Sequence, residues 1–365
     1  MRPLLRYPVV IAALMMASVL LTACGEEAEE PPPTPTATHE PSPTAVSPSP
    51  PATAAPTPVA GDVPMFRGNA ARTGVNPGPG VEGSPRLLWR VKAGSISLLG
   101  PSPAVVGGVV YLGGGSFDHH VYALEAATGE ERWRFETGSD ALSSPAVVDG
   151  VVYVGSGDSY VYALDAATGE ERWHFKTGDG VACSPAVVDG VVYIGSNDTY
   201  VYALDAATGE ERWRFQTGDI VWSSPAVVEG VLYIGSHDSY VYALEAATGE
   251  ERWRFGTGKP VMSSPAVVDG VLHVGSLNGY VYTLDAATGE QRWVFRTGSG
   301  VRRSPAVADG LVYVASDDFY ALDAATGEER WHFKTGLAFS PSVVDGVVYV
   351  GSNGFGGYVY AITEE

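Results

Sequence analysis

The chain has 365 residues, of which 45% are hydrophobic, and its formal net charge is -20. This charge argues against nucleic-acid binding, because a phosphate backbone is bound by clustered Lys and Arg side chains. The two cysteines, Cys24 and Cys183, do not form the even, closely spaced set of a disulfide framework. We attribute the acidity to the repeats described below, each of which carries Asp or Glu in its turns.

Residues 1–23 have the pattern of a signal peptide. Arg2 and Arg6 precede an apolar stretch at 9–21, which is too short to span a bilayer comfortably. The sequence Leu-Thr-Ala-Cys that ends at Cys24 resembles the bacterial lipobox, in which the cysteine is lipidated and becomes the first residue of the mature protein. We therefore expect lipid anchoring through Cys24 in a bacterial cell envelope, with the rest of the chain on the extracytoplasmic side of the membrane.

Residues 24–61 form the predicted tether. Four glutamates lie close to its start, and Pro, Thr, Ser and Ala dominate the remainder. Such a composition cannot bury enough apolar area to fold, and a polyproline conformation would extend it by roughly 100 Å. The lead-in segment, residues 62–85, follows the tether, and the sequence alone assigns it no role.

A repeat of about 40 residues fills the chain from residue 86 to residue 365. The run from Tyr160 to Trp173 returns with small changes along this region. Its tryptophan recurs, mostly at intervals of 40 residues, at Trp89, Trp133, Trp173, Trp213, Trp253, Trp293 and Trp331. A fixed period of about 40 with strand-like content is typical of a propeller blade array.

Each repeat contains four predicted strands. In the second repeat these are residues 144–148, 151–154, 160–164 and 172–176. An Asp-Gly pair separates the first two strands, and this is a strong hairpin signal because glycine tolerates positive φ. Four strands in about 40 residues make one blade of a β-propeller.

The number of repeats predicts seven blades. Ser-Pro pairs open the first strands at Pro103, Pro145, Pro185, Pro225, Pro265, Pro305 and Pro341. The last repeat lacks a fourth strand, whereas the strand at 87–91 precedes the first repeat unmatched. We expect an all-β, seven-bladed β-propeller that is closed by pairing 87–91 with the last blade, which removes an open sheet edge and favours a monomer.

The segment Ala-Leu-Asp-Ala-Ala-Thr-Gly-Glu-Glu-Arg-Trp that ends at Trp173 resembles the tryptophan-docking motif of the pyrroloquinoline quinone (PQQ) repeat superfamily. This superfamily includes quinoprotein dehydrogenases and BamB-type outer-membrane assembly lipoproteins. The resemblance covers about 86–365, and residues 65–74 look like the lead-in of many such proteins. It implies that each motif tryptophan stacks against the neighbouring blade and is structural.

The dehydrogenases of this superfamily imply PQQ and a Ca²⁺ ion held by Glu and Asn, often with adjacent cysteines. This chain has no adjacent cysteines and no insertion-borne acidic cluster. His119 and His120, next to Asp118, are the strongest metal-ligand candidates, but neighbouring strand residues point to opposite faces. We therefore expect no metal, no cofactor and no catalysis.

Positions that differ between repeats are candidates for binding, although drift in unconstrained loops would give the same pattern. They follow the second and fourth strands and so share one face. The candidate binding residues are Trp222, Met262, Arg302, Arg303, Phe339, His119, His237 and Phe355. We expect a non-catalytic scaffold that binds an envelope or extracellular protein or glycan there. The alternatives are a BamB-like assembly lipoprotein and a PQQ-dependent oxidoreductase.

Overall fold

The computed structural model describes residues 63–74, 101–115, 117–334, 339–344, 347–352 and 358–362. All of them belong to the second of the two compact units of the chain, which comprises residues 54–365. None of these residues forms a helix long and apolar enough to cross a membrane. The predicted signal peptide, the lipidated Cys24, the strand at 87–91 with its Trp89, and Phe355 lie outside the described residues.

The described residues form seven antiparallel sheets, six of four strands and one of three. We number the sheets 1–7 in chain order. Sheet 1 contains β1 (Ala104–Val106), β2 (Val109–Gly113), β3 (His120–Glu125) and β4 (Glu131–Glu136); sheet 2 contains β5 (Ala146–Val148), β6 (Val151–Gly155), β7 (Tyr160–Asp165) and β8 (Glu171–Lys176); and sheet 3 contains β9 (Ala186–Val188), β10 (Val191–Gly195), β11 (Tyr200–Asp205) and β12 (Glu211–Gln216). Sheet 4 contains β13 (Ala226–Val228), β14 (Val231–Gly235), β15 (Tyr240–Glu245) and β16 (Glu251–Gly256); sheet 5 contains β17 (Ala266–Val268), β18 (Val271–Gly275), β19 (Tyr280–Asp285) and β20 (Gln291–Arg296); sheet 6 contains β21 (Ala306–Ala308), β22 (Leu311–Ala315), β23 (Phe319–Asp323) and β24 (Glu329–Phe333); and sheet 7 contains β25 (Ser342–Val344), β26 (Val347–Ser352) and β27 (Tyr358–Ile362).

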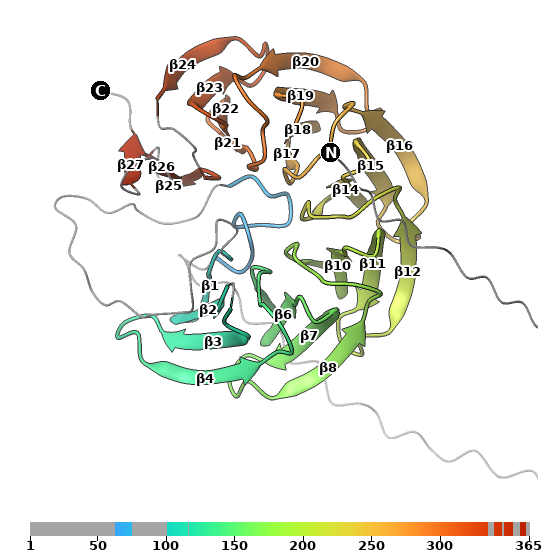
Figure 1. The fold of residues 1–365 in the computed structure, drawn as a ribbon, viewed down its shortest axis with the longest axis vertical. Helices are drawn as coiled ribbons and strands as arrows, with labels where there is room; N and C mark the ends of the chain where they lie inside the picture. Colours follow the sequence, from blue (N-terminus) through green and yellow to red (C-terminus); the bar gives the residue numbers. More distant parts are fainter. Residues whose placement is uncertain are drawn as a thin grey trace, which may run out of the picture. The chain divides into compact units, whose positions relative to one another are not determined.

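Within every sheet the strands follow chain order, so each sheet is a meander. The first strands of successive sheets contact one another, and the sheets are arranged around a common centre (Figure 1). This is the architecture of a β-propeller. The tight hairpin between β5 and β6 has positive φ at both Asp149 (50°) and Gly150 (72°), as the twist of two-residue hairpins requires.

Because strands alternate in direction, the two ends of every sheet differ. We call the end with the β5–β6 and β7–β8 turns, and their equivalents, the turn face. We call the opposite end, with the β6–β7 loop, the β8–β9 connection and their equivalents, the loop face. The variable positions of the sequence therefore belong to the loop face.

The inner strands are shorter than predicted, because each Ser-Pro pair lies outside the sheet. Ser144 is an example: its N–H donates to the hydroxyl of Ser184 in the next sheet at 3.1 Å. Proline has no N–H to give to a sheet ladder. The same bond links each serine to the next in the series Ser102, Ser144, Ser184, Ser224, Ser264, Ser304 and Ser340. The Ser-Pro pairs thus tie the sheets together around the centre.

The hydrophobic core lies between successive sheets, and the motif tryptophans close its outer part. The indole N–H of Trp173 donates to the carbonyl of Ala206 in the next sheet at 3.0 Å. The Tyr153 hydroxyl donates to the same carbonyl at 3.1 Å. Gly209 has φ +76°, and a Cβ there would lie 2.7 Å from the Trp173 ring. The same indole bond joins Trp133 to Ala166, Trp213 to Ala246, Trp253 to Ala286, and Trp293 to Ala324. Trp331 packs beside Tyr313 and Phe319 of its own sheet.

Residues 63–74, which we call the axial segment, lie among the inner strands (Figure 1). Val63 pairs with Val105 of β1 through two backbone hydrogen bonds, of 2.7 and 2.8 Å. Further carbonyls of the segment accept N–H groups from five other inner strands, at Val147, Val227, Val267, Val307 and Val343. Backbone hydrogen bonds therefore join this single aperiodic segment to six of the seven sheets.

Two buried arginines complete the axial segment. Arg72 donates to the carbonyls of Pro225 at 2.9 Å and Pro185 at 2.8 Å, and also bonds Ser184 and Phe66. Arg67 donates to the carbonyls of Pro305 and Pro341. Burial lowers the pKa of each guanidinium to about 9, so both remain charged at neutral pH. Charge-assisted hydrogen bonds to backbone carbonyls offset the free-energy cost of burying these two charges.

Candidate recognition surface on the loop face

Trp222 lies on the connection between β12 and β13. Its indole N–H donates to the side-chain oxygen of Asn197, on the β10–β11 loop, at 2.8 Å. Its ring meets the His237 ring, on the β14–β15 loop, edge to face with centroids 4.8 Å apart. The half-buried indole thus bridges sheets 3 and 4 and keeps part of its surface exposed.

His237 is held beneath this indole. Its backbone N–H donates to the Ile220 carbonyl at 3.0 Å. Its Nε2 atom is buried and has no hydrogen-bond partner among the described residues. Burial lowers the pKa of His237 despite the nearby carboxylates of Asp219 and Asp238, so the imidazole is neutral at neutral pH. The Trp222–His237 pair is therefore an uncharged aromatic surface.

The next part of the loop face combines apolar and basic side chains. Met262 and Leu277 are half-buried, and Arg302 is exposed. The Leu277 N–H donates to the Pro260 carbonyl at 3.0 Å, and its side chain would contact a Cβ built on Gly300 at 3.4 Å. Leu277 therefore joins the connections that carry Met262 and Arg302.

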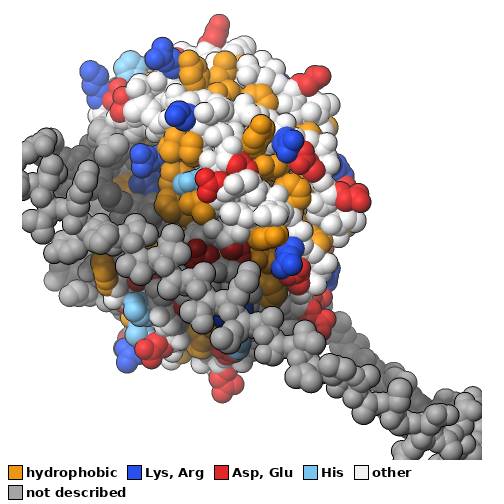
Figure 2. All heavy atoms as spheres, turned by 45° about the vertical axis from the view of Figure 1, so that its right-hand side comes forward, with side chains coloured by type: hydrophobic (Ala, Val, Ile, Leu, Met, Phe, Trp, Pro, Cys, Tyr) orange, Lys and Arg blue, Asp and Glu red, His pale blue; other side chains and the backbone are white. Residues whose placement is uncertain are grey.

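Arg303 and Phe339 pack together although they come from different connections. The guanidinium carbon of Arg303 lies 4.7 Å from the centroid of the Phe339 ring, within the range of a cation–π contact. Burial, and secondarily the charge of Arg302, lower the pKa of Arg303. Figure 2 shows one side of the unit, on which groups of hydrophobic side chains border both basic and acidic ones.

His119 does not join this group, because it belongs to sheet 1. Its Nε2 lies 3.5 Å from Asp140, whereas His120 pairs with Asp118 at 3.0 Å, so the two imidazoles face different carboxylates. Neighbouring Phe117 is 85% exposed. Trp222 and His237 are thus brought together, as are Arg303 and Phe339, and His119 is not placed with either pair.

The recurring aspartates of the loop face are structural. Asp158 accepts the Gly138 N–H at 2.6 Å, the Tyr160 N–H at 3.0 Å and the Tyr162 hydroxyl at 2.8 Å. Asp198 and Asp238 form the equivalent bonds in the next two sheets. These carboxylates hold the loop tips in place and leave the preceding residue of each loop to vary.

Cys183 occupies the position of a repeated serine. Its sulfur lies 3.1 Å from the Gly195 nitrogen, where Ser223 accepts the Gly235 N–H at 3.0 Å. The thiol is 2% exposed, and burial raises its pKa to about 12. A buried protonated thiol is unreactive, which favours a structural substitution.

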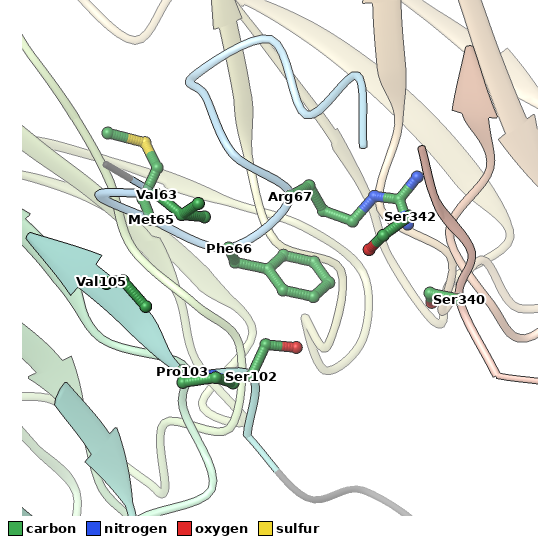
Figure 3. Close-up of a pocket in the computed structure, with 9 residues that line it drawn as sticks. All are labelled: Val63, Met65, Phe66, Arg67, Ser102, Pro103, Val105, Ser340 and Ser342. Carbon is green, nitrogen blue, oxygen red and sulfur yellow. The ribbon is translucent and has the colours of Figure 1, made fainter. Parts of the chain in front are cut away.

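A cavity of about 290 Å³ lies between the axial segment and sheets 1 and 7 (Figure 3). The Phe66 ring projects between Ser102 on one side and Ser340 on the other. Arg67 extends toward Ser342, and its Nε has no hydrogen-bond partner among the described residues. The cavity thus offers serine hydroxyls and one guanidinium nitrogen, without an acidic side chain in its lining.

The described side chains around the axial segment do not match the Glu and Asn ligands of a Ca²⁺–PQQ site. No group of three or more His, Cys, Asp or Glu side chains within the described ranges is placed to hold a metal ion. The centre of the inner strands is occupied by the axial segment, and its two arginines already bind backbone carbonyls.

Three residues of this surface are absent from the sequence-based candidates. Asn197, Leu277 and Lys259 occupy variable positions next to Trp222, Met262 and Arg302. The sequence could have identified Lys259 as a candidate, because the charge at this repeat position changes sign from the equivalent Asp179 and Asp219. Asn197 carried the same variability as the candidate His237, but this does not reveal its contact with an indole 25 residues further along the chain.

Comparison with known proteins gives the family. A family model described as outer membrane protein assembly factor BamB matches residues 82–183, 157–255 and 237–364. The serine/threonine-protein kinase AfsK of Streptomyces griseus is 39% identical over 82 residues, or 21% of this chain, and the match spans 10% of the kinase's length.

Solved structures share the fold at low sequence identity. BamB from Moraxella catarrhalis has a TM-score of 0.61 and 20% identity, covering 72% of this chain and 85% of that one. A europium-containing methanol dehydrogenase has a TM-score of 0.70 and 17% identity, covering 80% and 82%. The quinohemoprotein alcohol dehydrogenase ADHIIG from Pseudomonas putida HK5 has a TM-score of 0.69 and 20% identity, covering 82% and 71%. Because the family model matches most of the chain, this protein belongs to the PQQ-like β-propeller repeat family described by BamB.

Proposed function

We propose that this protein is a non-catalytic binding scaffold of the bacterial envelope that recognises a protein partner through its loop face. The observation that carries the proposal is the Asn197–Trp222–His237 cluster. Half-buried tryptophans held by neighbouring side chains are typical of interface hot spots. The cluster stands on repeats whose other positions are nearly alike, which isolates it as a local feature.

The envelope location rests on two lines of support. The family description names outer-membrane assembly, and BamB is one of the structural relatives. The lipobox-like sequence ending at Cys24 supplies an anchor, and the Pro- and Thr-rich tether supplies reach. Replacing Cys24 with Ser should release the protein from washed membranes, whereas retention of that variant in the membrane fraction would contradict lipid anchoring.

The closest alternative is a BamB-like role in outer-membrane protein assembly. It would also make the protein a binding scaffold of the envelope, and only the identity of the partner would differ. The oxidoreductase alternative has the dehydrogenases among the structural relatives as its support. We propose that no cofactor is needed, and PQQ with Ca²⁺ provides the test. If the protein reduced a dye with an alcohol substrate, and did so only when PQQ and Ca²⁺ were both added, it would be an enzyme and the scaffold proposal would be wrong.

The closed seven-bladed ring is part of the proposal. In sheet 1 the Gly129 N–H bonds the Glu125 carbonyl at 2.7 Å and Gly129 has φ 75°, which repeats the turn that receives Trp173 in sheet 3. Trp89 would dock on this turn if residues 87–91 complete sheet 7. The Trp89→Ala variant should lose several degrees in Tm, and an unchanged Tm would count against this closure.

In-cell photo-crosslinking tests the binding function directly. A benzoylphenylalanine at position 222 keeps an aromatic group in place, and a second probe at Met262 samples the neighbouring surface. The control is a probe at Ala207, which is exposed on the turn face. Gly209, two residues further, is unsuitable because a side chain there would strike Trp173.

We expect the same discrete adduct from positions 222 and 262 and none from 207. Mass spectrometry then names the partner. An adduct from position 207 alone would show that the partner binds the turn face. Adducts with glycan instead of protein would show that the partner is a glycan. No adduct from any position at native expression would overturn binding through this surface.

A further inference from the structure

The repeats contain an internal comparison of charge on the loop face. The first region comprises the connections 178–183 and 218–223 with the loop 196–199 between them. It carries three acidic side chains, Asp179, Asp198 and Asp219, and no basic one. The second region lies 80 residues further along the chain, at 258–263, 276–279 and 298–303. There the charged side chains are Lys259, Arg302 and Arg303, and none is acidic.

The reversal comes from individual substitutions on an unchanged backbone frame. Lys259 stands where Asp179 and Asp219 stand in earlier repeats, and Asn278 replaces the aspartate of the loop tip. Asn278 still accepts the Tyr280 N–H at 3.0 Å, as the repeated aspartates do. The loop therefore keeps its structural bond while losing its negative charge.

The basic side chains are placed beside the apolar ones. Lys259 and Arg302 are exposed, and Arg302 forms no ion pair with any described residue. Leu277 lies between their two connections, as its contacts with Pro260 and Gly300 show. The nearest acidic residues along the next loop are Asp317 and Asp318, and the Asp317 carboxylate is turned onto the Gly298 backbone. The result is a basic rim on an apolar patch.

We propose that the partner segment recognised here is acidic and apolar, with glutamate or aspartate side chains next to Leu or Phe. This inference rests on the proposed binding function and specifies its partner. On a protein of net charge -20, the exposed cations Lys259 and Arg302, in a region whose own sequence has no acidic residue, select an acidic segment and steer it to this part of the loop face. Met262 and Leu277, which lie beside these cations, receive its apolar side chains.

The apolar side chains decide between classes of anionic ligand. A nucleic-acid or sulfated-glycan chain would require a longer row of cations, and the surrounding carboxylates would repel it. The indole N–H of Trp222 is already used by Asn197, which leaves the ring surface rather than a donor for the ligand. The apolar surface of Met262 and Leu277 beside cations fits an acidic protein segment best.

Two fluorescent peptides test the inference by anisotropy with the full-length protein in detergent. The first contains glutamates flanking Phe and Leu residues, and the second has every glutamate replaced by glutamine. The key variant, Lys259→Asp with Arg302→Ala and Arg303→Ser, installs residues that equivalent repeats already carry, so the fold should persist. Met262→Ala is the matched variant that keeps all charges.

We expect the glutamate peptide to bind at least ~10-fold more tightly than the glutamine peptide, and this ratio should fall below ~3 in the triple variant and at 0.5 M salt. Met262→Ala should weaken both peptides equally. Equal binding of the two peptides, a ratio unchanged in the triple variant, or no peptide binding would overturn the acidic-partner inference. Binding of a sulfated oligosaccharide without peptide binding would do so as well. The crosslinks from position 222 would survive those outcomes, so the binding function itself is tested separately.

Discussion

The turn face and the loop face are two ends of the same strands, yet they are built differently. On the turn face Asp165 accepts N–H groups from Ala167 and Thr168 and pairs with Arg172 at 2.7 Å, which lowers the pKa of its carboxyl to about 2. Asp205 and Asp323 repeat this arrangement. On the loop face, by contrast, the residue at the tip of each loop differs from sheet to sheet: Gly157, Asn197, His237, Leu277 and Asp317 occupy this one repeat position.

The difference shows how a repeat can hold structure and recognition apart. The loop face also has a constant frame: the Thr177 hydroxyl lies 2.9 Å from the Ser159 carbonyl oxygen and 2.6 Å from that of Asp179, so that the two carbonyls share its single proton, and later repeats copy both contacts. The tip residues project from this frame and contribute little to it. They can therefore change charge and size without changing the backbone, which is the condition for a recognition surface.

The largest expected effect comes from a residue outside the repeats. Arg72→Met should cost about 4 kcal/mol of unfolding free energy, because it removes four hydrogen bonds to carbonyls, three of them buried. Urea unfolding followed by tryptophan fluorescence measures the change. Arg302→Met, at an exposed position of the loop face, is the control and should stay within about 0.5 kcal/mol. Equal effects would mean that the axial segment does not hold the sheets together.

Arg72 also marks the limit of prediction from sequence. The blade strands and hairpins follow from a period that repeats with the same residues, so each copy supports the others, and the family resemblance implied the inter-sheet tryptophan contacts. The axial segment occurs once, and its partners are backbone carbonyls and N–H groups, which leave no residue pattern in the repeats. The Trp222–His237 contact was equally hidden, because variability indicates freedom at a position and not the neighbour that the side chain meets.

A pair of glycines separates packing from backbone strain. Gly209 on the turn face and Gly258 on the loop face have φ values of +76° and +80°. A Cβ at Gly209 would lie 2.7 Å from Trp173, whereas one at Gly258 meets nothing within 4 Å. Gly209→Ala should cost about 3 kcal/mol and Gly258→Ala about 1 kcal/mol, the strain alone, in the same urea measurement. Equal costs would show that the turn face is not the more tightly packed end.

Between the two faces, His273 breaks the regularity of the interior. It stands where other sheets have tyrosine and contacts the Thr283 hydroxyl at 2.8 Å. Burial lowers its pKa to about 3. In the unfolded chain His273 takes up a proton near pH 6.5, whereas in the folded protein it stays neutral until about pH 3. The free energy of unfolding therefore falls as the pH drops from about 6.5 toward 3. We expect a loss of about 2 kcal/mol between pH 7 and pH 4.5 from this group.

The double variant His273→Tyr with Thr283→Ala restores the residues of the other sheets and provides the control for this titration. Its unfolding free energy should lose about 2 kcal/mol less than that of the natural protein over the same pH interval. Parallel pH profiles for the two proteins would assign the acid sensitivity to other groups, such as the turn-face carboxylates.

A small effect on stability should accompany the largest effect on binding. Trp222→Ala removes one hydrogen bond to Asn197 and the contact with His237, so it should cost about 1 kcal/mol. Trp173→Ala, on a docked indole that is 9% exposed, is the matched change and should cost clearly more. Binding of the crosslinked partner, measured with purified proteins, should fall at least ~10-fold in the first variant only. If Trp222→Ala destabilises the protein as much as Trp173→Ala and leaves binding intact, the indole belongs to the scaffold and the division between the two faces fails at its most distinctive residue.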